Sequence, residues 1–225
     1  MNSTEKLEKH FTPDYNGKNI YKWLSEDTTV PYVKLDIDIP YIEIYKEVMA
    51  IKDYFVVHRE TEGDGSWKSL CLHGIDSHYT NDWQYYDEFK NKPEPEYNWT
   101  SISKQCPLTT EFFKKTFPYK DYKRLRFMWI EPGGYILPHQ DLQQRHLAPV
   151  NVSIYNPIGC EFRYKNWGTV PFTHGSAFLV DVGQPHAVWN RSNEPRIHII
   201  AHGSKDWNRF LPMLEQSWKT QNKIK

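Results

Sequence analysis

The sequence predicts a mainly β fold with flanking helices. Between Lys123 and Ile200, short apolar or alternating runs recur, separated by Gly, Pro and Asn. Many short strands at such spacing are typical of a β-sandwich or β-barrel. Helical patterns occur before and after this region, and the 225 residues fit one domain better than two.

Residues 1–104 are expected to form an α/β extension that packs on the core. The first part, 1–30, is polar with scattered aromatic side chains and indicates an irregular arm. Alternation and β-rich composition then predict strands at 33–39, 54–57 and 67–73. Pro40 precedes a helical pattern at 41–51, and proline is tolerated at the first position of a helix.

A long loop is expected at 76–105, where Asp, Asn, Pro and aromatic residues gather. Loops of this length are uncommon unless they are functional or disordered. This one could close over a site as a lid, or it could be an exposed insertion. After it, Thr109 or Thr110 is expected to cap a helix that ends at Phe117, before Pro118.

Residues 105–205 are expected to form the β core and 206–225 to add a C-terminal helix, so that all regions together make a single domain. The strands of the core are expected at 125–130, 135–137, 150–154, 161–164, 177–181, 186–189 and 196–200. The closing helix is expected from Asp206 to Trp218.

Composition excludes several classes of protein. Lys and Arg together number 28, as do Asp and Glu, and a neutral chain lacks the electrostatic footprint of non-specific nucleic-acid binding. Cys71, Cys106 and Cys160 are widely spaced, which argues against a disulfide framework or a zinc ribbon. The polar N-terminus is unlike a secretory signal, and no run of eighteen apolar residues occurs. We therefore expect a soluble cytoplasmic protein without nucleic-acid or membrane partners, and the sequence does not indicate an oligomeric state.

Four polar residues form the main candidate site. His139 and Asp141 make a His-x-Asp pair, His186 follows His139 by 47 positions, and Arg196 follows His186 by ten. Side chains at i and i+2 of a strand point to the same side, so His139 and Asp141 would face one interior. Two imidazoles and a carboxylate can occupy one side of Fe(II) and leave other positions for O2 and a chelating co-substrate. The pattern therefore predicts a mononuclear iron site.

Arg196 is expected beside this site. His186 opens a strand after the turn 183–185, and Arg196 begins the returning strand after a second turn within 189–195. Antiparallel strands joined in this way would place Arg196 near His186. A guanidinium there can bind a carboxylate with two parallel hydrogen bonds. His198 shares the side of Arg196 and could line the pocket.

Each of these residues alone has a simpler structural interpretation. A single histidine on a strand is more often a structural residue than a ligand, and a single arginine is more often a solvated ion-pair partner. Their combination within a β-barrel pattern favours the metal site. Other histidines compete for the same roles: His202 lies further along the strand of Arg196, while His146 and His174 are expected in loops.

The order of these motifs resembles the aspartyl/asparaginyl β-hydroxylase-like branch of the 2-oxoglutarate/Fe(II) dioxygenases, which includes bacterial proline 3-hydroxylase. The resemblance covers roughly residues 105–205. It rests on the segments 124–126, 132–141, 151–154, 178–190 and 196–200, with a fainter likeness at 67–74. In one departure, the β-hydroxylase that names the family lacks the metal carboxylate, whereas this chain has Asp141, as the proline hydroxylase does.

The resemblance implies a double-stranded β-helix of the jelly-roll, cupin-like kind that holds Fe(II) on His139, Asp141 and His186. Arg196 would pair with the distal carboxylate of 2-oxoglutarate, and Asn151 would place a polar group against this co-substrate. The implied reaction is hydroxylation of an unactivated C–H bond by O2, with 2-oxoglutarate as co-substrate and ascorbate able to stimulate turnover. The substrate is expected to be a small-molecule or peptidyl amino acid, and the likeness to proline hydroxylase favours a free one.

Two other functions stay open on the sequence alone. A metal cupin could isomerise or oxidise its substrate without 2-oxoglutarate, and it would not require Arg196. A non-catalytic β-barrel could bind a ligand and keep only a vestigial metal site. Turnover of 2-oxoglutarate to succinate separates these three functions.

Overall fold

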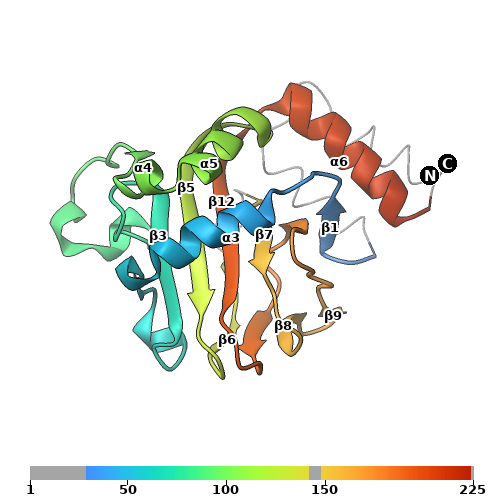
Figure 1. Ribbon diagram of the computed structural model, residues 1–225, viewed down its shortest axis with the longest axis horizontal. Helices are drawn as coiled ribbons and strands as arrows, with labels where there is room; N and C mark the ends of the chain where they lie inside the picture. Colours follow the sequence, from blue (N-terminus) through green and yellow to red (C-terminus); the bar gives the residue numbers. More distant parts are fainter. Residues whose placement is uncertain (1–28, 142–147, 224–225) are drawn as a thin grey trace.

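Two antiparallel β-sheets form the molecule, and helices cover the outer side of the larger sheet (Figure 1). The computed structural model describes residues 29–141 and 148–223. In this part of the chain the large sheet has eight strands in the order β1-β10-β7-β12-β5-β3-β2, with β4 pairing with β3. The small sheet has the order β6-β11-β8-β9.

The bounds of these elements are as follows. The large sheet consists of β1 (Tyr32–Leu35), β2 (Val56–Val57), β3 (Trp67–Gly74), β4 (Asn98–Trp99), β5 (Tyr119–Ile130), β7 (Val150–Tyr155), β10 (Ala177–Val180) and β12 (Arg196–Lys205). The small sheet consists of β6 (Tyr135–His139), β8 (Cys160–Tyr164), β9 (Gly168–Thr169) and β11 (His186–Asn190). The described helices are α3 (Tyr41–Ala50), α4 (Ile102–Gln105), α5 (Pro107–Glu111) and α6 (Trp207–Gln221), together with short 3-10 turns and the π-helical segment η6 (Phe112–Thr116).

From β5 to β12 the chain passes back and forth between the two sheets. Strands β5, β7, β10 and β12 belong to the large sheet, whereas β6, β8, β9 and β11 belong to the small one. This winding is that of a double-stranded β-helix. It confirms the predicted mainly β fold with flanking helices.

Both sides of the large sheet are buried, so alternate residues of each strand enter different environments. Phe127 and Trp129 of β5 belong to the core shared with the helices, whereas Met128 and Ile130 belong to the core between the sheets. The positions that face the small sheet also carry buried polar side chains: Arg124 and Arg126 on β5, Asn151 and Ser153 on β7, and Arg196, His198 and His202 on β12. The candidate site is built from this inner layer.

The helices pack on the opposite side through short apolar stripes. Helix α3 crosses the large sheet (Figure 1) and buries Ile44 and Val48, which are spaced i, i+4. Helix α6 buries Phe210 and Leu214 in the same way. These contacts pack the helices on the outer side of the sheet, whereas the cavity lies on its inner side.

Most predicted elements occur where the sequence placed them, and four differ. The strand predicted at 54–57 is limited to β2, because residues Lys52–Tyr54 form the 3-10 turn η2. The strand predicted at 33–39 ends at Leu35, because its partner strand β10 begins at Ala177, opposite Leu35. The next N–H, that of Asp36, donates to Ser217 Oγ of α6. The helix predicted from Thr109 or Thr110 begins at Pro107, because Glu47 of α3 accepts hydrogen bonds from the N–H groups of the first turn. The loop predicted at 76–105 contains short regular segments: η4 (Trp83–Tyr85), η5 (Asp87–Phe89), β4 and α4.

Some predicted features lie outside the described residues. The irregular arm predicted at 1–30 lies outside the described residues except for its last two, and His146 lies outside them as well. The division of the chain at residues 104 and 205 stays a prediction. No helix of the described ranges is long and apolar enough to cross a membrane.

Candidate active site

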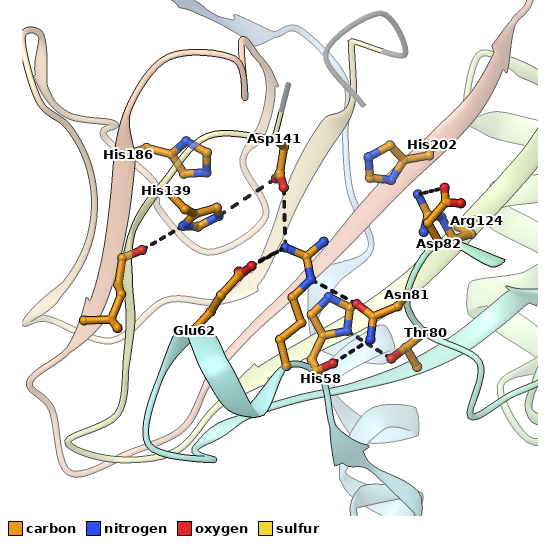
Figure 2. Close-up of polar contacts among 12 residues, drawn as sticks. His58, Glu62, Thr80, Asn81, Asp82, Arg124, His139, Asp141, His186 and His202 are labelled. Atoms are coloured by element: carbon orange, nitrogen blue, oxygen red, sulfur yellow. Dashed lines mark hydrogen bonds and ion pairs between the residues drawn. The ribbon is translucent and has the colours of Figure 1, made fainter. Parts of the chain in front are cut away.

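Three side chains converge at one end of the small sheet. The ligand atoms of His139, Asp141 and His186 all lie within 4.8 Å of one another. His139 ends β6 and pairs in register with His186, the first residue of β11, and their ring centroids are 4.4 Å apart. Asp141 follows two residues later, where its N–H donates to the carbonyl of Val182 at 2.9 Å. The structure therefore brings together the three residues that the sequence singled out (Figure 2).

Backbone carbonyls orient both imidazoles. Nδ1 of His139 donates to the carbonyl of Leu137 at 2.7 Å, and Nδ1 of His186 donates to the carbonyl of Gln184 at 2.8 Å. In each case the acceptor lies two residues before the histidine. These bonds fix the tautomer in which Nε2 carries the lone pair, and this nitrogen is then available to a metal.

His186 is held in its neutral form by its surroundings. Burial, followed by the neighbouring His139, lowers the pKa of His186 to about 4. The ring of Phe162 stacks on the imidazole, with centroids 4.9 Å apart and planes at 9°. A neutral imidazole with a fixed tautomer matches the form that metal ligation requires.

Arg59 approaches the triad from the large sheet side. Its Nη1 lies 3.6 Å from Asp141 and 2.9 Å from Glu62, and its Nε donates to Asn81 at 3.0 Å (Figure 2). Burial lowers the pKa of Arg59, but Asp141 and Glu62 more than offset this, so that the pKa is raised. The guanidinium also lies over the ring of Trp67, at 5.8 Å from its centroid. It is therefore a fixed positive charge beside the candidate metal carboxylate.

Arg196 lies in the same cavity and is 3% exposed. Its Nε donates to Asn156 Oδ1 at 3.1 Å, and its Nη2 donates to Nδ1 of His198 at 3.1 Å. Within the described ranges no carboxylate lies within 4.0 Å of this guanidinium. Burial lowers its pKa to about 10, so the group stays charged at neutral pH.

His198 and two asparagines hold Arg196 in place. Nε2 of His198 donates to Asn156 Oδ1 at 3.2 Å, which leaves Nδ1 as an acceptor. The Asn151 side-chain amide lies beside this nitrogen, 2.7 Å from Nδ1. Burial, then Arg196, lowers the pKa of His198 well below its ordinary value. The network is thus a neutral frame around a charged guanidinium.

The cavity between the sheets connects these groups. Among the described residues that line it, the charged ones are Arg59, Arg126, Arg196 and Asp141. The rest of the lining combines histidines with apolar side chains, including Met128, Val182 and Val188. One carboxylate among three guanidiniums makes the cavity suited to anions.

Comparison with known proteins decides the family. Residues 37–205 match the family described as aspartyl/asparaginyl beta-hydroxylase. The chain belongs to this family. Membership confirms the class of enzyme that the motif string implied, a 2-oxoglutarate/Fe(II)-dependent oxygenase. It also extends the resemblance, expected over 105–205, toward the N-terminus.

Solved structures and curated proteins complete the comparison. The fold is similar to that of a Pseudomonas putida prolyl-4-hydroxylase, with 11% identity, a TM-score of 0.46, and coverage of 83% of this chain and 98% of that chain. It is also similar to a prolyl hydroxylase from Trichoplax adhaerens in complex with a hypoxia inducible factor oxygen degradation domain peptide fragment, with 12% identity, a TM-score of 0.47, and coverage of 94% and 97%. No curated protein matches the chain.

His186 and Arg196 lie on strands of different sheets. The strands of His186 and Arg196 were expected to run side by side, but β11 belongs to the small sheet and β12 to the large one. Both residues nevertheless line the same cavity, because the connection between them crosses from one sheet to the other. His174 lies in a turn, as expected.

The sequence did not single out Arg59, Arg126 or Asn156. Arg59 and Asn156 lie outside the regular strands, and Arg126 stands in an apolar run. For Arg126, the sequence contained one indication of a functional role: a charged residue within an apolar run that predicts a strand buried on both sides. That indication needs the sheet order, which decides which positions face inward.

Proposed function

We propose that this family member is an Fe(II)- and 2-oxoglutarate-dependent dioxygenase that hydroxylates an unactivated C–H bond of an amino acid or amino-acid side chain. His139, Asp141 and His186 would hold the metal. The observation that carries this proposal is the convergence of two fixed imidazoles and one carboxylate within 4.8 Å. Two nitrogen donors and one oxygen donor suit Fe(II) and leave positions open for other ligands.

The surroundings of Arg196 fit a dicarboxylate co-substrate. A buried guanidinium is stable in a protein when an anion compensates it, and the described residues supply none within 4.0 Å. The distal carboxylate of 2-oxoglutarate would take this place. His198 and Asn156 would fix the guanidinium plane for bidentate binding, and Asn151 would add a polar contact.

The protein's contribution is to bind, orient and exclude water. When bound, Fe(II) supplies the chemistry that couples O2 and 2-oxoglutarate to oxygen insertion into a C–H bond, and ascorbate would keep the metal ferrous. His139 and His186 present Nε2 because their Nδ1 protons are engaged by carbonyls. Apolar side chains such as Val182 and Val188 line the cavity and limit the access of water.

The rivals without 2-oxoglutarate leave Arg196 unexplained. A cupin that isomerises or oxidises its substrate alone needs no buried cation beside the metal. A vestigial binding module has no reason to keep a charged guanidinium out of water, since burial of an uncompensated charge is costly.

Ligand-induced thermal stabilisation tests the proposal. With Mn(II) in place of Fe(II), N-oxalylglycine should raise the Tm of the wild-type protein, because a ligand that binds only the folded state stabilises it. The shift should vanish in Arg196→Ala and persist in Arg163→Ala, a control at an exposed position of β8. Equal shifts in both variants would exclude Arg196 as the carboxylate partner.

Turnover gives a second test. Wild-type protein with Fe(II), 2-oxoglutarate and ascorbate should form succinate in the presence of a broad amino-acid and peptide pool, and mass spectrometry should find a product that has gained one oxygen atom. His139→Ala should abolish both signals. Absence of succinate from the wild-type protein would favour a binding module.

A further inference from the structure

A second buried arginine lines the cavity opposite the metal ligands. Arg126 stands on the inner side of β5, is 3% exposed, and shares the cavity with Arg196 and Asp141. Neither the proposed metal site nor the proposed 2-oxoglutarate site uses it.

The hydrogen bonds of Arg126 are incomplete. Nη1 donates to the carbonyl of Thr80, and Nη2 donates to Nδ1 of His202 at the long distance of 3.4 Å. Nε is buried and has no hydrogen-bond partner among residues 29–141 and 148–223. Two adjacent donors of the guanidinium therefore remain for a ligand, while Thr80 anchors the third. A carboxylate can bind such a pair side by side.

Two neighbouring arginines, Arg59 and Arg124, have negative partners, whereas the described residues supply none within 4.0 Å of Arg126. Arg59 lies 2.9 Å from Glu62 and 3.6 Å from Asp141. Nη2 of Arg124 lies 3.5 Å from Asp82. Among the described residues no carboxylate comes within 4.0 Å of Arg126. With Arg196 assigned to 2-oxoglutarate, one positive charge in the cavity is still uncompensated.

The electrostatic surroundings agree with this. Burial, followed by the positive charge of Arg124, lowers the pKa of Arg126 to about 9, so the group is still protonated at neutral pH. A charge kept out of water in this way is unfavourable until an anion reaches it.

We propose that Arg126 binds the carboxylate of the substrate, which makes the substrate a carboxylic acid of the amino-acid class that enters the cavity carboxylate first. The proposal rests on the oxygenase function proposed above and adds a substrate contact to it. Because Arg126 is 3% exposed, only a carboxylate at the end of a molecule or side chain reaches it. An α-carboxylate and an Asp or Glu side chain share this chemistry.

The segment after β3 forms part of this subsite. Thr80 anchors Arg126 through its carbonyl and bonds to Nδ1 of His58 through Oγ1 at 2.9 Å. Asn81 accepts from Nε of Arg59. Thr80 and Asn81, in this part of the predicted loop, are therefore fixed to the two cavity arginines.

The test measures thermal shifts of the Mn(II) protein with N-oxalylglycine, using the twenty L-amino acids and their α-carboxamides as probes. At least one acid should raise the Tm, and removal of its carboxylate charge should abolish the shift. Arg126→Gln should weaken the binding of that acid by at least about tenfold, which is the scale of a charge-assisted hydrogen bond. The stabilisation by N-oxalylglycine itself should persist in Arg126→Gln.

The pattern of thermal shifts distinguishes an α-carboxylate from a side-chain carboxylate as the group that binds Arg126. An α-carboxylate site loses binding with every α-carboxamide. A side-chain site binds aspartate or glutamate and their α-carboxamides but neither asparagine nor glutamine. The proposal is overturned if no amino acid raises the Tm, if compounds that lack both an α-carboxylate and a side-chain carboxylate act as well as the acids, or if Arg126→Gln binds the acid unchanged. Failure of the proposed function differs, because N-oxalylglycine would then not stabilise the wild-type protein.

A second variant separates binding from a structural role. Arg126→Met keeps the length of the side chain and removes a buried charge, so the Tm of the metal-free protein should stay equal or rise. Arg163→Met, at an exposed position of β8, should leave the Tm unchanged. A lower Tm in Arg126→Met alone would mean that Arg126 serves the fold, and it would overturn the proposal.

Discussion

His139 and His186 are cross-strand partners on β6 and β11, with ring centroids 4.4 Å apart, and each donates Nδ1–H to the carbonyl two residues before it. The same local device therefore sets the tautomer of both rings. A paired register and two backbone acceptors therefore preorganise the two imidazoles of the candidate metal site through main-chain geometry.

Asp141→Asn should weaken metal binding, because it replaces the anionic ligand by a neutral amide. Loss of an outer partner of a metal ligand already costs about 10–100-fold in affinity, so loss of the ligand itself should cost at least that. Isothermal titration with Mn(II) measures the change. Asp87→Asn, at an exposed residue of η5, is the control and should bind Mn(II) like the wild-type protein. Equal affinity in both variants would remove Asp141 from the ligand set.

Substitutions of Arg59 and Glu62 should change the affinity for Mn(II) in opposite directions. Arg59 competes with the metal for Asp141, so Arg59→Met should tighten Mn(II) binding by roughly fivefold, or about 1 kcal/mol. Glu62→Gln leaves Arg59 with Asp141 as its remaining acidic partner among the described residues, and it should weaken Mn(II) binding. The two dissociation constants are compared in one buffer at one salt concentration. Changes of the same sign would contradict this account.

Asn156→Ala should raise the KM for 2-oxoglutarate more than it lowers kcat. Asn156 accepts hydrogen bonds from both Arg196 and His198, so its loss frees the guanidinium to rotate. The effect should be severalfold in KM, as expected for one hydrogen bond of about 1 kcal/mol. Succinate formation against 2-oxoglutarate concentration measures it, with Asn98→Ala on β4 as an exposed control. A change confined to kcat would assign Asn156 another role.

The metal-free protein should lose stability in acid through its buried histidines. Burial lowers the pKa of His73 from 6.5 to about 4 and holds the pKa of His58 well below its ordinary value. Between these pH values the unfolded chain binds protons that the folded chain does not, so the free energy of unfolding falls as pH falls from 6.5 to about 4. Above pH 6.5, His58 and His73 should no longer make the free energy of unfolding depend on pH.

His73→Phe should reduce the slope of the free energy of unfolding against pH, by up to the contribution of about one proton. The ring of His73 packs edge-on against Trp99 at 5.1 Å and its Nδ1 has no hydrogen-bond partner, so a phenyl ring suits the site. Urea unfolding at several pH values gives the slope. The exposed His78→Asn serves as the control and should reproduce the wild-type slope. An unchanged slope in His73→Phe would show that His73 is protonated in the folded state.

Much of the fold and of the metal site could be predicted because the information is local. The i, i+2 spacing of His139 and Asp141 fixes their common side, and short apolar runs mark the strands. The prediction erred where a distant side chain replaced a local partner. Glu47 of α3, distant in the sequence, accepts hydrogen bonds from the N–H groups that begin α5.

The sequence by itself determined the class of fold and singled out three candidate metal ligands and a candidate arginine for the co-substrate, because alternation and motif order are properties of the sequence. Only the tertiary structure decided which buried charges lack a counter-charge. Arg124 and Arg126 stand two residues apart on one strand, yet Asp82 reaches the first and no described carboxylate reaches the second. Charge compensation acts through space over a few ångströms, and the folded chain alone sets those distances.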